Sequence, residues 1–90
     1  MSPPYPGAGP YRLVFTPEAQ AQCQRLPSRQ RGSVERTLAR LARTVGLRQY
    51  VSPSEAMEEF QVHVAAAIVS YELDPGLRAL VVKRVETEGR

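Results

Sequence analysis

Two side chains in this sequence stand out for chemistry because each is the only one of its kind. His63 is the single histidine and Cys23 the single cysteine among the 90 residues. An imidazole can donate or accept a proton near neutral pH, although a lone histidine on a strand is also commonly a plain surface residue. A reactive thiol needs an activating neighbour, and no histidine lies near Cys23 in the sequence. We therefore predict that Cys23 is a small buried apolar residue and keep both interpretations of His63 open.

The arginines form the second chemical signal, because they are concentrated in one half of the chain. Residues 1–50 carry eight arginines against Glu18 and Glu35, whereas residues 51–90 carry four basic and seven acidic residues. A basic half of this kind attracts a polyanion such as RNA or an acidic protein partner. The same side chains could equally be the solvated face of a surface helix.

Composition excludes several classes of protein. One cysteine cannot form a disulfide within the chain or a thiolate metal cluster, and we predict neither a metal nor a small-molecule cofactor. No apolar run approaches the roughly 18 residues that span a bilayer. Residues 1–10 lack the pattern of a secretory signal, so we expect a cytoplasmic protein. The length and the 42% apolar content predict one folded domain with a single core.

The elements that position these residues begin after a tail. Residues 1–10 hold four prolines and two glycines, which predicts a flexible segment ahead of a single domain over residues 11–90. In residues 11–15, aromatic and large apolar side chains occupy every second position, which predicts a strand. Its apolar face consists of Tyr11, Leu13 and Phe15.

Two helices follow as a predicted hairpin. Thr16 can cap the first helix and Pro17 fits its first position. Its buried face consists of Ala19, Cys23 and Leu26. A break at Pro27 starts the second helix at Ser28, which runs to about Val45. Its apolar stripe consists of Val34, Leu38, Leu41, Ala42 and Val45, which predicts packing by one side only.

Three further strands are predicted, over residues 60–64, 68–73 and 77–85. A turn within residues 65–67 separates the first two strands, and Asp74, Pro75 and Gly76 make the next turn. The last strand is apolar on both faces, which predicts a central place in the sheet. Strict alternation assigns Ala79, Val81 and Val85 to one face and Leu80 and Val82 to the other. The spacing of Ser52 and Glu55 also predicts a helical turn through Met57.

The order β–α–α–β–β–β predicts an α+β fold, in which the N-terminal strand and a helical hairpin pack on a small, twisted, mainly antiparallel sheet. In its order of elements and in several segments, the sequence resembles the toxins of the RelE/ParE superfamily from bacterial toxin–antitoxin modules. The segments that carry the resemblance are residues 11–19, 38–41, 60–64 and 68–74. Tyr71 matches a recurrent tyrosine of that family. The resemblance covers about residues 11–85 and implies a cognate antitoxin as partner.

The resemblance also implies a site. Ribosome-dependent members cut messenger RNA with its own 2′-OH, which requires cations around the phosphate and a group that moves a proton. The basic positions of the second strand fall on Gln61 and His63, the third-strand arginine falls at or near Ile68, and the C-terminal arginine matches Arg84. A tyrosine near the C-terminus has no match. His63 and Arg84 are therefore the predicted catalytic residues, although an ion pair with a nearby glutamate is an equal alternative for Arg84.

Two functions follow from the resemblance. The first is a toxin that acts as a ribosome-dependent mRNA endonuclease with an atypical site. The second is a non-catalytic binding module, either a ParE-like inhibitor of DNA gyrase or a degenerate member that acts through protein contacts. The residues predicted to bind RNA or a partner are Arg36, Arg40, Arg43, Gln61, Arg78 and Lys83. An unrelated α+β protein that shares the pattern by chance is a third alternative.

Overall fold

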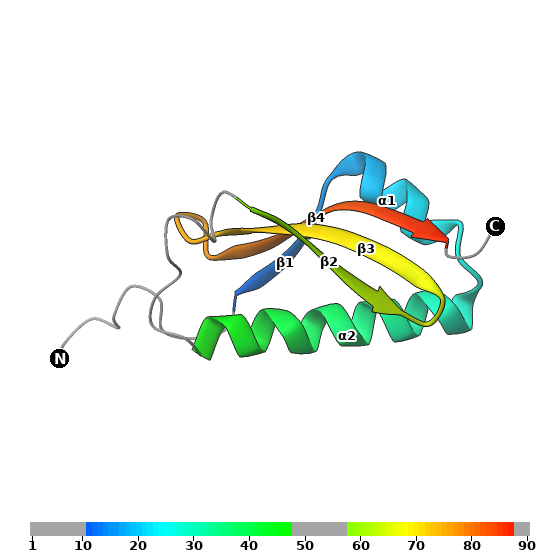
Figure 1. Cartoon of the computed structure of the whole chain (residues 1–90), viewed down its shortest axis with the longest axis horizontal. Helices are drawn as coiled ribbons and strands as arrows, with labels where there is room; N and C mark the ends of the chain where they lie inside the picture. Colours follow the sequence, from blue (N-terminus) through cyan, green and yellow to red (C-terminus); the bar gives the residue numbers. More distant parts are fainter. Residues whose placement is uncertain (1–10, 48–57, 88–90) are drawn as a thin grey trace, which may run out of the picture.

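A computed structural model describes residues 11–47 and 58–87 of the chain (Figure 1). These residues form β1 (Arg12–Phe15), α1 (Pro17–Gln24), α2 (Ser28–Leu47), β2 (Glu59–Val64), β3 (Ala67–Asp74) and β4 (Ala79–Thr87). The predicted element order is therefore confirmed. The predicted tail at residues 1–10 and the helical turn through Met57 lie outside the described residues. No helix in the described part is long and apolar enough to cross a membrane.

The four strands form one mixed sheet in the order β1-β4-β3-β2. β1 runs parallel to β4, with Arg12 opposite Ala79, and the other neighbours are antiparallel. β4 is thus a central strand with a neighbour on each side, as its two apolar faces predicted. α2 runs along one face of the sheet, and α1 lies beside the C-terminal end of β4 (Figure 1).

The start of α1 follows the predicted capping pattern. The hydroxyl of Thr16 accepts a 3.1 Å hydrogen bond from the backbone N–H of Ala19, and Pro17 occupies the first helical position. Farther along α1, the side-chain oxygen of Gln22 accepts a 2.7 Å hydrogen bond from the backbone N–H of Val85. α1 therefore pairs with β4 beyond the point where β1 ends.

One core fills the space between the helices and the covered face of the sheet. The core residues of the helices, all predicted, are Ala19, Cys23, Val34, Leu38, Ala42 and Val45, and the predicted Leu26 joins them from the connection between α1 and α2. The core residues of the strands are Ala67, Val69, Leu73, Leu80, Val82 and Val85, and Tyr11 joins them from the position before β1. Leu13 and Phe15 pack against this cluster, so the predicted apolar face of β1 is confirmed.

A bulge in β4 changes which face its later residues take. The pairing with β3 skips one position between Val82 and Arg84, so Lys83 is an extra residue. Val85 consequently joins Leu80 in the core, and its predicted assignment to the opposite face was wrong. Strict alternation failed because it does not allow for an inserted residue. The bulge also leaves Lys83 and Arg84 exposed side by side.

Two turns connect the last three strands. Ala65 and Ala66 form the β2–β3 turn with φ of 51° and 64°, which places it within the predicted residues. Gln30 of α2 donates a 2.6 Å hydrogen bond to the carbonyl of Ala65 and so ties this turn to the helix. After Asp74, the second turn extends through Arg78, so β4 begins two residues later than predicted.

Candidate functional site

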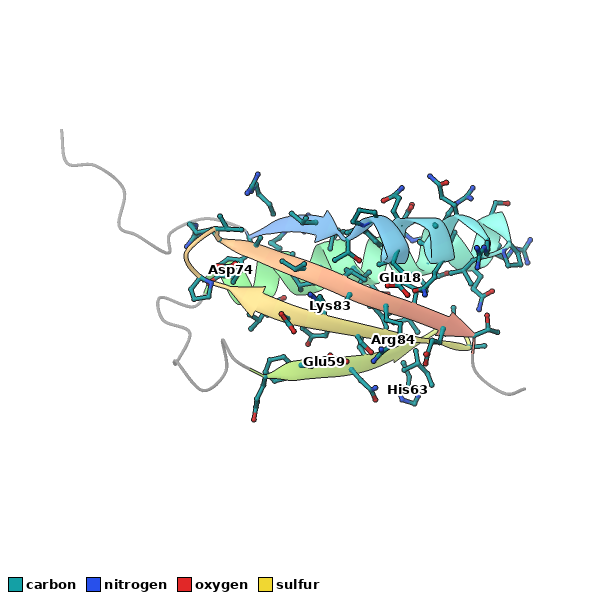
Figure 2. The ribbon with its side chains drawn as sticks, turned by 90° about the horizontal axis from the view of Figure 1, so that it is seen from above. Glu18, Glu59, His63, Asp74, Lys83 and Arg84 are labelled. Atoms are coloured by element: carbon teal, nitrogen blue, oxygen red, sulfur yellow. The ribbon has the colours of Figure 1, made fainter. Side chains whose placement is uncertain are left out.

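The predicted catalytic residues lie on the face of the sheet opposite α2, which we call the outer face (Figure 2). The strand register arranges this face in rows. One row runs from Gln61 on β2 through Ser70 on β3 to Arg84 on β4, and the next runs from His63 through Ile68 to Glu86. These rows define the candidate site.

His63 and Arg84 are brought onto one surface by this register. They lie two strands apart and one row apart, which separates their Cα atoms by about 12 Å from the usual spacing of strands. Both residues are exposed. An arginine and a histidine at this separation can approach one phosphodiester from two sides.

Arg84 is engaged by two carboxylates. Its Nη2 lies 3.1 Å from Oε2 of Glu59, and its Nε lies 3.6 Å from Oε2 of Glu86. The ion pair that the sequence left as an alternative for Arg84 is therefore confirmed. Nε and Nη2 form one edge of the guanidinium, which is the edge that can hold two oxygens of one phosphate. In this structure, carboxylates from β2 and β4 occupy that edge.

Ser70 lies between Gln61 and Arg84 and is 2% exposed. It is the buried polar residue of the described chain, and no buried side-chain polar atom there lacks a hydrogen-bond partner. Sequence reasoning missed Ser70 and did not say which glutamates would pair with Arg84. The alternation of Glu59, Gln61 and His63 along β2 was the available signal for a polar outer face.

The charges of the outer face are mixed in sign. Ile68 occupies the position where the resemblance implied a third-strand arginine, and it is half-buried. The register places Arg12 and Arg84 on this face together with Glu59, Glu72, Asp74 and Glu86. Lys83 adjoins Arg84 (Figure 2). The outer face is therefore close to neutral and differs from a strongly basic phosphate-binding surface.

The main basic surface lies on α2. Arg29, Arg36, Arg40 and Arg43 are all exposed and follow one another at intervals of seven, four and three residues. This spacing aligns them along one side of the helix, which we call the arginine stripe. Because α2 packs on the face of the sheet opposite the candidate site, the stripe and the site are two separate surfaces (Figure 1).

Lys83 and Arg78, the remaining predicted binding residues, occupy different places. Lys83 adjoins Arg84 in the bulge, and its carbonyl accepts a 3.5 Å hydrogen bond from the hydroxyl of Thr16. Arg78 lies in the β3–β4 turn, where its guanidinium is 5.0 Å from the centre of the Tyr11 ring. Arg84 lies six positions farther along the chain, about 20 Å away. Arg78 therefore lies outside the candidate site.

Cys23 is buried, as predicted. Burial raises the pKa of its thiol above the ordinary value of 9.0, the nearby charge of Glu35 raises it further, and Arg31 opposes both. The residue is thus a protonated thiol at neutral pH and a poor nucleophile. Within residues 11–47 and 58–87, no three His, Cys, Asp or Glu side chains come together as a metal site.

The fold is that of the RelE toxins. No protein-family model and no curated protein matches the sequence. A chain of the toxin–antitoxin complex RelBE2 from Mycobacterium tuberculosis superposes with a TM-score of 0.67 and 20% identity, over 91% of this chain and 95% of that chain. The isolated RelE toxin of E. coli gives 0.66 and 15%, over 89% and 86%. The intact E. coli RelBE complex gives 0.65 and 16%, over 89% and 99%. The predicted α+β fold is confirmed.

Proposed function

We propose that this protein is the toxin of a toxin–antitoxin module and cleaves RNA at the outer face of its sheet, with His63 and Arg84 as catalytic residues. One observation carries the proposal: a RelE-like fold places an imidazole and a guanidinium on the same exposed surface. The similar structures are described as RelE toxins or as complexes that contain them, which supports a toxin role.

The chemistry needs few groups because RNA brings its own nucleophile. The 2′-oxygen attacks the adjacent phosphorus, the bond to the 5′-oxygen breaks, and a 2′,3′-cyclic phosphate and a 5′-hydroxyl result. His63 would move the proton taken from the 2′-OH or given to the 5′-oxygen. Arg84, with Lys83 beside it, would stabilise the charge that develops on the phosphate.

We expect the site to cleave RNA slowly. Ile68 supplies no cation at the third-strand position, and loss of one preorganised contact costs about 3 kcal/mol, or about a hundredfold in rate. Binding must therefore hold the RNA in place from elsewhere. The arginine stripe on α2 can contact the backbone phosphates of structured RNA such as that of the ribosome. An antitoxin with an acidic segment would complement the same basic half of the chain.

A second candidate function is a binding module that acts without catalysis, for example on DNA gyrase or another protein. It is favoured by the engagement of Arg84 with Glu59 and Glu86, which leaves the outer face close to neutral. In that case the ion pairs stabilise the sheet, and the arginine stripe or the sheet edge contacts the partner.

Expression in a heterologous bacterium separates the two candidates. Residues 1–90 would be induced beside a His63→Ala/Arg84→Ala variant and a Gln20→Ala control, which alters an exposed residue of α1 outside the candidate site. Growth would be followed and the 5′ ends of cellular messages mapped. Growth arrest with new 5′ ends that disappear only in the double variant establishes the endonuclease. Growth arrest without new ends, retained in the double variant, establishes the binding module. Normal growth with the unaltered chain contradicts toxicity in that host.

A further inference from the structure

The side chain of Arg84 lies across the sheet instead of extending into solvent. Arg84 belongs to β4 and Glu59 to β2, so their 3.1 Å contact spans the intervening strand β3. The aliphatic stem of an arginine in this position covers the strand beneath it. The burial of Ser70, which is the β3 partner of Arg84, agrees with that arrangement.

The local charges favour this position of Arg84. Glu59 stands directly opposite Glu72 in the β2–β3 pairing, and like charges at such positions repel. The guanidinium of Arg84 beside Glu59 offsets that repulsion. Glu86, two residues farther along β4, approaches Nε of the same guanidinium. The arginine is thus placed among carboxylates that compete with any incoming anion.

We propose that Glu59 and Glu86 screen Arg84, so that a phosphate group engages this arginine only after it displaces a carboxylate. The inference rests on the proposed RNA-cleaving site and deepens it, because it makes Glu59 a residue that limits how well the site holds its substrate. RNA that is anchored elsewhere, for example on the arginine stripe, would supply phosphate at a high enough local concentration to compete. Free RNA in solution would compete less well.

The expected size of the screening follows from the exposure of the ion pair. The Arg84 and Glu59 side chains are 45% and 40% exposed, so water already weakens their attraction. An exposed ion pair of this kind can lower the affinity of the arginine for a competing phosphate by roughly two- to fivefold. Glu59→Gln should therefore raise the affinity of Arg84 for phosphate by about that factor. Because the change also removes the repulsion of Glu72, the variant is expected to fold.

The test compares Glu59→Gln with Glu58→Gln, which removes the same charge from the preceding exposed residue. The first probe is inorganic phosphate, followed through the Nε–Hε signal of Arg84 by NMR. The second probe is a short 2′-O-methyl RNA, which cannot be cleaved, followed by fluorescence anisotropy. Thermal denaturation of each variant establishes that it is folded. A tighter response to both probes in Glu59→Gln than in Glu58→Gln supports the inference, provided that the gain in RNA affinity is lost again in Glu59→Gln/Arg84→Gln.

Equal responses of Glu59→Gln and Glu58→Gln to phosphate would overturn the screening of Arg84. A different result would contradict the proposed function: Arg84→Gln alone would leave both RNA affinity and message cleavage unchanged. Because the phosphate titration reports on Arg84 directly, it tests whether Glu59 screens Arg84 whether or not the protein cleaves RNA.

Discussion

The side-chain oxygen of Gln22 accepts the backbone N–H of Val85 at 2.7 Å, beyond the last residue of β1. β4 is nine residues long and β1 only four, so the later part of β4 has no strand on that side. A glutamine from α1 therefore provides the hydrogen-bond acceptor that a longer β1 would have supplied. This contact joins α1 to the same strand that carries Arg84.

Replacing Gln22 should destabilise the protein. Gln22→Ala leaves the N–H of Val85 without its acceptor, and we expect the free energy of unfolding to fall by about 1–2 kcal/mol. Urea denaturation followed by circular dichroism measures the change. Gln20→Ala, at an exposed position of the same helix, should change stability by less than about 0.5 kcal/mol. Equal effects of the two substitutions would show that the Gln22–Val85 bond contributes nothing.

The β2–β3 turn should be improved by glycine. Ala66 has a φ of 64°, a conformation that its Cβ disfavours. We expect Ala66→Gly to stabilise the protein by about 0.5–1 kcal/mol, measured by the same urea denaturation. Ala39→Gly, at an exposed position inside α2, should destabilise by about 1 kcal/mol. Destabilisation by both glycines would contradict the positive φ of this turn.

The arginine stripe should dominate the salt dependence of RNA binding. Arg36→Gln/Arg40→Gln removes two phosphate contacts, which should lower the slope of log affinity against log salt by about 1.4 for single-stranded RNA. The matched variant Arg25→Gln/Arg31→Gln changes the net charge equally but at positions away from both the stripe and the outer face. Anisotropy titrations at several salt concentrations compare the two. If both variants lose the same slope, RNA responds to net charge and does not bind the stripe.

Cys23 should make stability fall at alkaline pH. Its pKa is raised in the folded protein by burial, so the folded state holds the thiol proton more tightly than the unfolded chain does. The resulting stabilisation is fully present below the unfolded pKa and is lost as pH rises above about 9, through the folded pKa. Urea denaturation at pH 7, 9 and 10 should show a steeper decline for the unaltered chain than for Cys23→Ala. Parallel declines would exclude a contribution from this thiol.

Most of the fold could be predicted because local signals and tertiary packing agree. Thr16 and Pro17 mark the start of α1 chemically, and the Val34–Leu38–Ala42 spacing identifies the buried side of α2 without knowledge of its partner. The Ala65–Ala66 turn was harder to place, since alanine gives no turn signal and the hairpin register decides the backbone conformation. Tertiary contacts such as the Gln30 bond to Ala65 determine that turn.

The site was less predictable than the fold. The exposure of His63 and Arg84 on one face follows from the strand pairing, and the bulge at Lys83 keeps Arg84 on that face while Val85 enters the core. Two buried valines three positions apart in a strand were the sequence signal for the bulge. The contact of Arg84 with Glu59 joins residues 25 positions apart on non-adjacent strands, so only the completed sheet reveals it.

The parallel pairing of β1 with β4 has a consequence for the time course of synthesis. Thr16 and Lys83, which meet across this pairing, are 67 positions apart. At translation rates of about 5–20 residues per second, the first strand waits roughly 3–13 s for its neighbour to be made. Pairing over such a sequence separation is also slow to form once both strands exist. A truncation that removes β4 would therefore deprive β1, β3 and α1 of their shared neighbour at once, and no smaller domain would remain.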